Sequence, residues 1–221
     1  MTYILNIETA TKNCSVSLAK DGKTILLKEI AEQGYSHAEK LHVFIEDILK
    51  EAGITVRDLK AIAISKGPGS YTGLRIGVSA AKGLCYALQI PLISVDTLQV
   101  LAQKVTQNDG LIIPMIDARR MEVYSAVFDP NYQKIVEVQA EVLTEVSYAD
   151  RTETIYIVGD CQEKCQSVLT AVNFVFLSEI VFPSANEMSP ISYKKFIQNE
   201  FEDVAYFEPF YLKDFMLTKK T

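Results

Sequence analysis

Apolar residues in the first half of the chain follow two spacings, one typical of strands and one typical of helices. Short apolar runs, or runs that alternate with polar residues, predict strands, whereas apolar residues three or four positions apart predict helices. Asp21-Gly22 stands between two alternating runs and predicts a tight hairpin. The predicted elements are the strands Tyr3–Ile7, Cys14–Lys20 and Lys23–Ile30, a helix His37–Ala52, a strand Leu59–Ser65, a helix Thr72–Leu88, a strand Leu92–Val95 and a helix Thr97–Val105.

Capping residues mark the ends of these helices. Ser36 and Glu39 stand at the spacing of a capping box before the first helix, and Gly53 follows its last turn. Thr97 is expected to cap the helix that it opens. Capping signals and apolar spacing therefore predict the same first helix.

The second half of the chain repeats this order in shortened form. Three strands come first, with a turn at Pro130-Asn131, and further strands and helices follow. The repeat predicts an α/β protein of two related lobes rather than one doubly wound sheet, with residues 1–108 in the first lobe and 109–221 in the second. The predicted elements are the strands Leu111–Ile116, Met121–Phe128, Gln133–Val142, Ile155–Val158 and Phe174–Leu177, with helices over Cys161–Ala171 and Met188–Phe201.

Composition and charge narrow the classes of function. The 221 residues are 48% hydrophobic and carry a formal net charge of -6, so they can bury one large core or two small ones. The negative charge disfavours a protein that binds nucleic acid by itself, because phosphate contacts need clustered Lys and Arg. The start of the chain lacks the pattern of a signal peptide, and no apolar stretch is long enough for a membrane span, so a cytoplasmic protein is expected.

The stretch Lys66–Arg75 is the most informative in the chain. Its glycines and proline predict a sharp turn from strand to helix, and Ser70 or Thr72 is expected to cap the helix. A phosphate-binding P-loop is excluded because no lysine follows Gly73, and a hydrolase elbow is excluded because Ser70 lacks flanking glycines. A dinucleotide-binding turn, and a turn that only packs the helix on its sheet, stay open as alternatives.

This turn and two other segments resemble the TsaB family, formerly YeaZ. The resemblance rests on Gly67–Gly77 with Ala81–Leu84, on Asp117–Tyr124, and on the tail Pro209–Lys213, where the family more often ends in Arg. The duplicated order of elements is similar to that of the actin, Hsp70 and sugar-kinase superfamily. The resemblance implies two lobes of the ribonuclease H-like type, the second of them shortened.

For function, the resemblance implies a non-catalytic subunit in the synthesis of threonylcarbamoyladenosine in tRNA. Such a subunit binds and activates TsaD, the related protein that transfers the threonylcarbamoyl group to the adenosine beside the anticodon, together with the ATPase TsaE. It pairs with a second copy of itself when TsaD is absent, and it meets tRNA only through the complex. Two alternatives stay open, a glycoprotease-like peptidase and a weak nucleotide-binding relative of the kinases.

The residues themselves give reasons to expect no active site. A TsaD-like metal site uses two histidines four apart on one helix, but His37 and His42 are five apart, which places them about 140° apart around the axis. In Glu8–Thr11 an alanine replaces the glycine of the superfamily's first phosphate loop, which leaves Thr9 and Thr11 as weak candidates for nucleotide binding. No catalytic residue, metal or cofactor is therefore expected.

The four cysteines are too scattered for a disulfide framework or a four-ligand zinc site. Cys161 and Cys165 stand one helical turn apart, so their thiols can face the same way, but they make only half of a metal site. Two ordinary thiols on a short helix are the favoured interpretation.

The two helices that flank the signature turn are expected to bind the partner. The first has more apolar residues than one sheet contact needs, and the second carries small residues that let another backbone approach. The double change Ile45→Asp with Val78→Asp is expected to abolish binding to TsaD while the monomer stays folded. The predicted interface residues are His37, Leu41, Phe44, Ile45, Ile48, Arg75, Gly77, Val78, Ala81 and Lys82.

Overall fold

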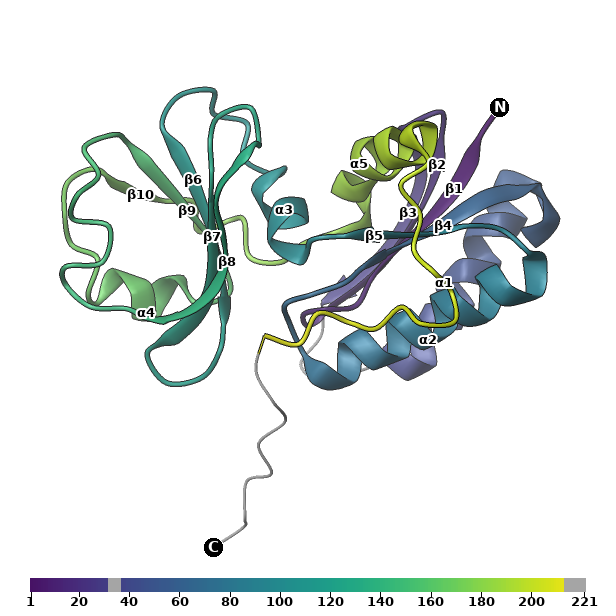
Figure 1. Ribbon diagram of the computed structural model, residues 1–221, viewed down its shortest axis with the longest axis horizontal. Helices are drawn as coiled ribbons and strands as arrows, with labels where there is room; N and C mark the ends of the chain where they lie inside the picture. The colour runs from purple at the N-terminus through teal and green to yellow at the C-terminus, as the bar shows by residue number, and fades with distance from the viewer. Residues whose placement is uncertain (32–36, 213–221) are drawn as a thin grey trace, which may run out of the picture.

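The computed structural model describes residues 1–31 and 37–212, which form two lobes, each built on a five-stranded sheet. Figure 1 shows the two sheets next to each other along the long axis of the molecule, with the C-terminal segment returning across the first lobe. The repeat in the sequence is thus a repeat in the fold, as predicted.

The strands of the first lobe are β1 (Tyr3–Glu8), β2 (Asn13–Lys20), β3 (Lys23–Ala31), β4 (Leu59–Ser65) and β5 (Leu92–Val95). They lie in the order β3-β2-β1-β4-β5. β1 pairs antiparallel with β2 and parallel with β4, so the hairpin lies on one side of β1 and the crossover strands on the other. Apolar side chains leave β1 on both faces, because helices cover both faces of the sheet.

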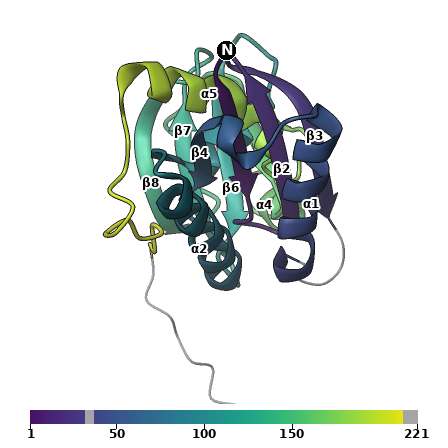
Figure 2. The same ribbon diagram turned by 90° about the vertical axis from the view of Figure 1, so that its right-hand side faces the viewer.

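Two helices, α1 (His37–Ala52) and α2 (Tyr71–Leu88), lie side by side on one face of this sheet (Figure 2). Their inner residues, such as Leu41 and Val78, form one core cluster with Leu5 of β1. A 3-10 turn, Val56–Asp58, follows α1 and leads into β4. The inner face of α2 is therefore used in the core, and a partner could contact α2 only through the face that points away from the sheet.

The strands of the second lobe are β6 (Leu111–Asp117), β7 (Glu122–Phe128), β8 (Lys134–Val142), β9 (Ile155–Gly159) and β10 (Phe174–Phe176). Their order, β8-β7-β6-β9-β10, repeats that of the first lobe. The connection from β8 to β9 forms turns where the first lobe has α1, and the helix after β9, α4 (Gln162–Gln166), has five residues. The second lobe is the shortened copy, as predicted.

Two helices pack on the sheet of the other half of the chain. α3 (Thr97–Ala102) follows β5, but its Leu98 and Leu101 pack against the second sheet. α5 (Ala185–Gln198) belongs to the second half of the sequence, but Met188 and Ile191 pack on the first sheet. The packing units therefore do not follow the predicted division between residues 108 and 109 throughout.

The bounds of the strands agree closely with the prediction, and those of the helices differ more. α3 ends at Ala102 rather than Val105, and α4 ends at Gln166 rather than Ala171. The hydroxyl of Ser167 donates a hydrogen bond to a backbone carbonyl of α4 (2.7 Å), a local bond that competes with further helix.

Two of the predicted helix starts are corrected by their caps. Asp96, not Thr97, is the N-cap residue of α3, because the hydroxyl of Thr97 accepts a hydrogen bond from the backbone N–H of Gly67 (3.1 Å). α5 begins at Ala185 rather than at Met188, because Ser184 caps it there. The cap predicted at Ser36 lies outside the described residues.

Asp96 also ties the two lobes together. Its carboxylate accepts a hydrogen bond from Nζ of Lys134 in β8 (2.5 Å) and lies 3.0 Å from Nζ of Lys66, which follows β4. Burial alone would raise the pKa of Asp96, but the hydrogen bond from Lys134 and the charge of Lys66 outweigh burial and lower it. This partly buried ion-pair network fixes the first sheet relative to the second.

Candidate functional site

The signature turn joins β4 to α2 and packs against the loop that follows β1. Gly67 has φ +115, a conformation that favours glycine. A Cβ atom at Gly69 would lie 2.3 Å from the carbonyl oxygen of Ala10, and one at Gly73 would lie 2.1 Å from that of Thr9. The glycines are thus needed because two backbone segments touch.

The candidate nucleotide-binding residues of the loop after β1 are engaged within the lobe. The hydroxyl of Thr9 donates to the carbonyl oxygen of Gly73 (2.8 Å), and Nε2 of His37 donates to the carbonyl oxygen of Thr11 (2.8 Å). Thr9 is fully buried and Thr11 is 5% exposed. Their side chains and backbone hold the loop on α1 and α2 rather than facing a ligand.

The start of α2 is also used within the chain. Ser70 is the N-cap residue, and its hydroxyl accepts a hydrogen bond from the backbone N–H of Gly73 (3.3 Å), as the sequence predicts for this position. The backbone N–H of Ser70 itself donates to Ala10 (2.7 Å). Two of the donors that could bind an anion at this helix end, the backbone N–H groups of Ser70 and Gly73, are therefore engaged by the chain itself.

Glu8 ends β1 directly before this loop and is fully buried. Its Oε1 accepts a hydrogen bond from the backbone N–H of Ala10 (2.6 Å). Burial raises the pKa of Glu8 from its ordinary value of 4.5 to about 7, because the charged carboxylate loses its hydration, and the hydrogen bonds from the loop offset only part of this effect. The loop after β1 thus packs on the carboxyl group of Glu8, whose pKa is near neutral pH.

We predict that Glu8 makes the stability of the protein fall as the pH rises from about 5 to 8. Between the unfolded and folded pKa values, the folded chain binds more protons than the unfolded chain, so the free energy of unfolding decreases with pH. The fall should be about 3 kcal/mol, and Glu8→Gln should remove it. Urea unfolding of both proteins across this pH range measures the difference.

The matched control for this titration is Glu39→Gln, on the exposed side of α1. It should leave the dependence of stability on pH as it is in the unchanged protein. The same fall in Glu8→Gln as in the unchanged protein would show that another group titrates.

The predicted interface residues divide into a surface set and a buried set. Arg75 is exposed, and Phe44 and Lys82 are half-buried. Ile45 and Val78 are 6% and 4% exposed in the core of the first lobe, so the structure leads us to expect that aspartates there would unfold this lobe rather than leave an intact monomer. The buried set is His37, Leu41, Ile45, Ile48, Gly77, Val78 and Ala81.

The C-terminal segment after α5 runs along α2 and engages its two charged residues (Figure 1). Nζ of Lys82 donates to the carbonyl oxygens of Ala205 (3.1 Å) and Phe207 (2.8 Å). Nε of Arg75 donates to the hydroxyl of Tyr211 (3.3 Å). The two side chains that the sequence suggested as charged partner contacts therefore anchor the chain's own tail.

The outward face of α2, opposite the core, has no charged side chain. Exposed surface helices normally carry polar and charged residues there, and the only charged residues of α2 are the two that bind the tail. We call this surface the α2 outward face; its exposed residues are Thr72, Ser79, Gly83, Tyr86 and Ala87, and it is bordered by Ile76 and Ala80, which pack partly against the core.

Gly83 distinguishes this face from the rest of α2. A Cβ atom there would meet no atom within 4 Å, whereas Gly73 and Gly77 lie against the loop after β1. A glycine in an exposed helix interior costs about 1 kcal/mol relative to alanine. No contact within the described chain explains the glycine, but the close approach of another backbone would. Val43 of α1, 49% exposed, adds apolar surface on the neighbouring helix.

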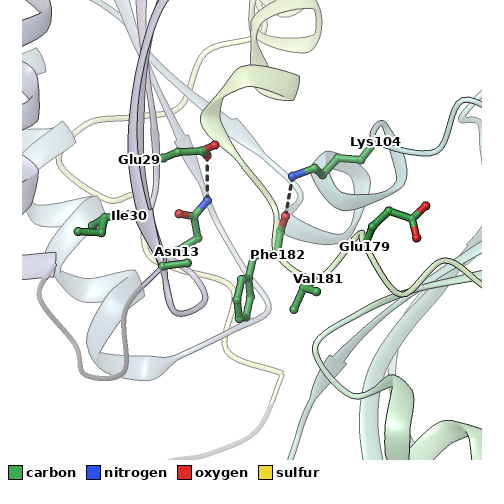
Figure 3. Close-up of a pocket in the computed structure, with 8 residues that line it drawn as sticks. Asn13, Glu29, Ile30, Lys104, Glu179, Val181 and Phe182 are labelled. Atoms are coloured by element: carbon green, nitrogen blue, oxygen red, sulfur yellow. Dashed lines mark hydrogen bonds between the residues drawn. The ribbon is translucent and has the colours of Figure 1, made fainter.

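A hollow of about 270 Å³ lies where the first lobe meets the segment that leads to α5 (Figure 3). Three of its polar side chains have partners in the chain: Glu29 accepts from Nδ2 of Asn13 (3.1 Å), and Nζ of Lys104 donates to the carbonyl oxygen of Phe182 (3.1 Å). The volume is below the usual range for small-molecule sites. The hollow does not include Thr9 or Thr11, so it adds nothing to the nucleotide alternative.

The loop after β6 lies within Asp117–Tyr124, a segment that carries part of the family resemblance, but no role was predicted for it. Arg119 and Arg120 are exposed and have φ +74 and +53, which is uncommon for residues other than glycine. The loop is held by Lys164, whose Nζ donates to the carbonyl oxygen of Arg120 (2.9 Å) and pairs with Asp117. A positive φ at consecutive arginines leaves no pattern that sequence reasoning could detect.

Within residues 1–31 and 37–212, no group of three or more His, Cys, Asp or Glu side chains is arranged to hold a metal ion. His37 is buried with its ring on Thr11, and His42 is exposed, so the two rings do not meet. In the same ranges, none of the helices combines the length and apolar character that a membrane span requires.

Comparisons with known proteins agree over most of the chain. A family model described as TsaD, tRNA N6-adenosine threonylcarbamoyltransferase, matches residues 27–214. The chain is 31% identical to the tRNA threonylcarbamoyladenosine biosynthesis protein TsaB of Escherichia coli (strain K12), over 98% of this chain and 97% of that protein. The solved structure of YeaZ from Pseudomonas aeruginosa has a TM-score of 0.83 at 26% identity, over 96% of this chain and 100% of that one.

A shorter match links the chain to the transferase itself. The tRNA N6-adenosine threonylcarbamoyltransferase of Bacillus thuringiensis (strain Al Hakam) is 38% identical over 109 residues, which cover 42% of this chain and 32% of that protein.

Proposed function

Since this chain belongs to the TsaB family of tRNA threonylcarbamoyladenosine biosynthesis proteins, we propose that it is a non-catalytic subunit that binds and activates TsaD. In this role it joins TsaD and the ATPase TsaE, which together transfer the threonylcarbamoyl group to the adenosine beside the anticodon of tRNA. Its contact with tRNA is indirect, through the complex.

The observation that carries this proposal is the uncharged α2 outward face with Gly83 at its centre. Charge is absent from the one side of α2 that faces neither the core nor the tail. The exposed glycine lowers the stability of the free helix and leaves room for a second backbone. Such a surface is suited to a helix packed closely against it.

A subunit of the same fold is the natural occupant of this face. The TsaD family model matches residues 27–214, a range that includes α1 and α2, so TsaD has helices that correspond to these two. Related subunits can pair through equivalent surfaces, and a second copy of this chain can take the same place when TsaD is missing. Of the predicted interface residues, Phe44, Arg75 and Lys82 stay at or near the surface of this lobe.

A non-catalytic role fits the way the chain uses its reactive groups. His37 holds the carbonyl oxygen of Thr11, and the loop after β1 is closed by hydrogen bonds to α2. The charge of -6 fits a protein that leaves tRNA to its partners.

The proposal is tested by reconstituting threonylcarbamoyl transfer from purified components and omitting one at a time. Transfer should be lost when this chain is omitted, and the chain alone should give no transfer and no peptidase activity, with or without a chelator. Full transfer by TsaD and TsaE without this chain would contradict the activator role. Peptide cleavage by the purified chain, retained after further purification, would favour the peptidase alternative.

A further inference from the structure

Three sulfur atoms meet in the second lobe, between β6 and α4. Sγ of Cys165 lies 3.6 Å from Sγ of Cys161 and 3.5 Å from Sδ of Met115. Cys165 and Met115 are fully buried and Cys161 is 5% exposed, all within one apolar cluster. Met115 of β6 thus adds a third sulfur atom to the two thiols, which stand one helical turn apart in the sequence.

The surroundings of the two thiols are apolar. The two thiol groups and their protons lie in one apolar cluster, with Cys165 fully buried and Cys161 5% exposed. A soft metal ion can displace such a proton because the metal–thiolate bond replaces it.

The number and kind of donors select the metal. Zinc sites in proteins are almost always built from four ligands or from three ligands and water, with Cys, His or carboxylate donors, whereas two thiols and a thioether suit Cu(I). A metal–sulfur bond of about 2.3 Å places three sulfurs in a trigonal plane about 4 Å apart. The observed separations of 3.5 and 3.6 Å are slightly smaller, so the sulfurs would move apart by a few tenths of an ångström.

We propose that Cys161, Cys165 and Met115 bind one Cu(I) ion in three-coordinate sulfur geometry. Each thiol releases its proton to solvent as its copper–sulfur bond forms, and the thioether binds without a proton change. No electron is transferred, because the ion enters and stays as Cu(I). The exposed edge of Cys161 is the side from which the ion enters.

The test is an anaerobic titration of the full, reduced chain with Cu(I) in competition with a coloured Cu(I) chelator. One equivalent of Cu(I) per chain should leave the chelator. Cys161→Ser and Cys165→Ser should each abolish this binding, and Met115→Leu should weaken it at least about tenfold, since even an outer-shell partner contributes that much. Cys14→Ser and Cys85→Ser are the matched controls, because these buried cysteines lie in the first lobe and should not change the result.

X-ray absorption of the copper-loaded chain keeps the proposal testable if a variant fails to fold. Three sulfur neighbours at about 2.3 Å would support the site. Binding that survives in a folded Cys161→Ser or Cys165→Ser variant would overturn it, and so would nitrogen or oxygen neighbours alone. A Cys161–Cys165 disulfide that forms with peroxide, in a chain that takes no Cu(I), would also overturn it and make the pair a redox pair.

Discussion

Gly73→Ala should lower the free energy of unfolding by about 3 kcal/mol, with a fall in Tm of roughly 6–12 °C. A Cβ atom at this position would lie 2.1 Å from the carbonyl oxygen of Thr9, and a backbone atom cannot turn aside as a side chain can. The loop after β1 would have to move, and Thr9 would lose its hydrogen bond to Gly73. Urea and thermal unfolding followed by circular dichroism measure the change.

Gly83→Ala is the control for this substitution, because it makes the same change in the same helix where nothing lies within 4 Å. It should raise the free energy of unfolding by up to about 1 kcal/mol, the helix preference for alanine over glycine. Opposite signs for the two variants would separate close packing from helix preference. Small and equal changes in the free energy of unfolding would mean that the loop after β1 does not pack closely against α2.

The double change Gly83→Glu with Ala87→Lys should weaken binding to TsaD at least roughly 100-fold, about 2.7 kcal/mol. Both positions are exposed on the α2 outward face, and the new side chains would have to lose water where a partner backbone packs. Because glutamate and lysine four positions apart stabilise a helix, the free protein should stay folded. Titration calorimetry with purified TsaD measures the affinity.

Ile197→Glu is the matched surface control for the double change. Ile197 is 60% exposed on α5, which covers the opposite face of the first sheet. This variant should bind TsaD as the unchanged chain does. Loss of binding in the control, or full binding by the folded double variant, would place the partner on another surface.

Local signals were sufficient for most of the fold. Asp21-Gly22 forms the predicted hairpin turn with positive φ at both residues, and Gly53 ends α1 with φ +67. The repeated strand order also follows from the sequence, because the strand patterns of both halves are clear. The exchange of α3 and α5 between the lobes does not, since the apolar face of a short helix does not specify which sheet covers it.

The candidate binding face was predicted less completely than the fold. The reason is that α2 carries two stripes of small and apolar residues, and the two stripes look alike in sequence. Val78 and Ala81 lie on one stripe, and Gly83 and Ala87 lie on the other. Only the tertiary structure shows that the sheet covers the first stripe. It also shows that Arg75 and Lys82 donate hydrogen bonds to the C-terminal segment. The helix itself was recognised correctly, but the face chosen as the interface lies largely in the core.

The buried groups were beyond the reach of sequence patterns for a different reason. Glu8 looks like any acidic residue at a strand end, and its raised pKa comes from burial under the loop that packs on α2. Met115 lies 50 residues from Cys165 in the chain, and only the packing of α4 on β6 brings the sulfurs together. Such contacts depend on the whole fold and leave no local spacing.

The proposed contact between the α2 outward face and TsaD can be tested by site-directed photo-crosslinking. Tyr86, 75% exposed beside Gly83, can be replaced by a benzophenone amino acid of similar shape, with Val172 in the second lobe as the control position. The probe at position 86 should crosslink to TsaD, and the probe at position 172 should not. A complex that forms but crosslinks only from position 172 would contradict the proposed contact.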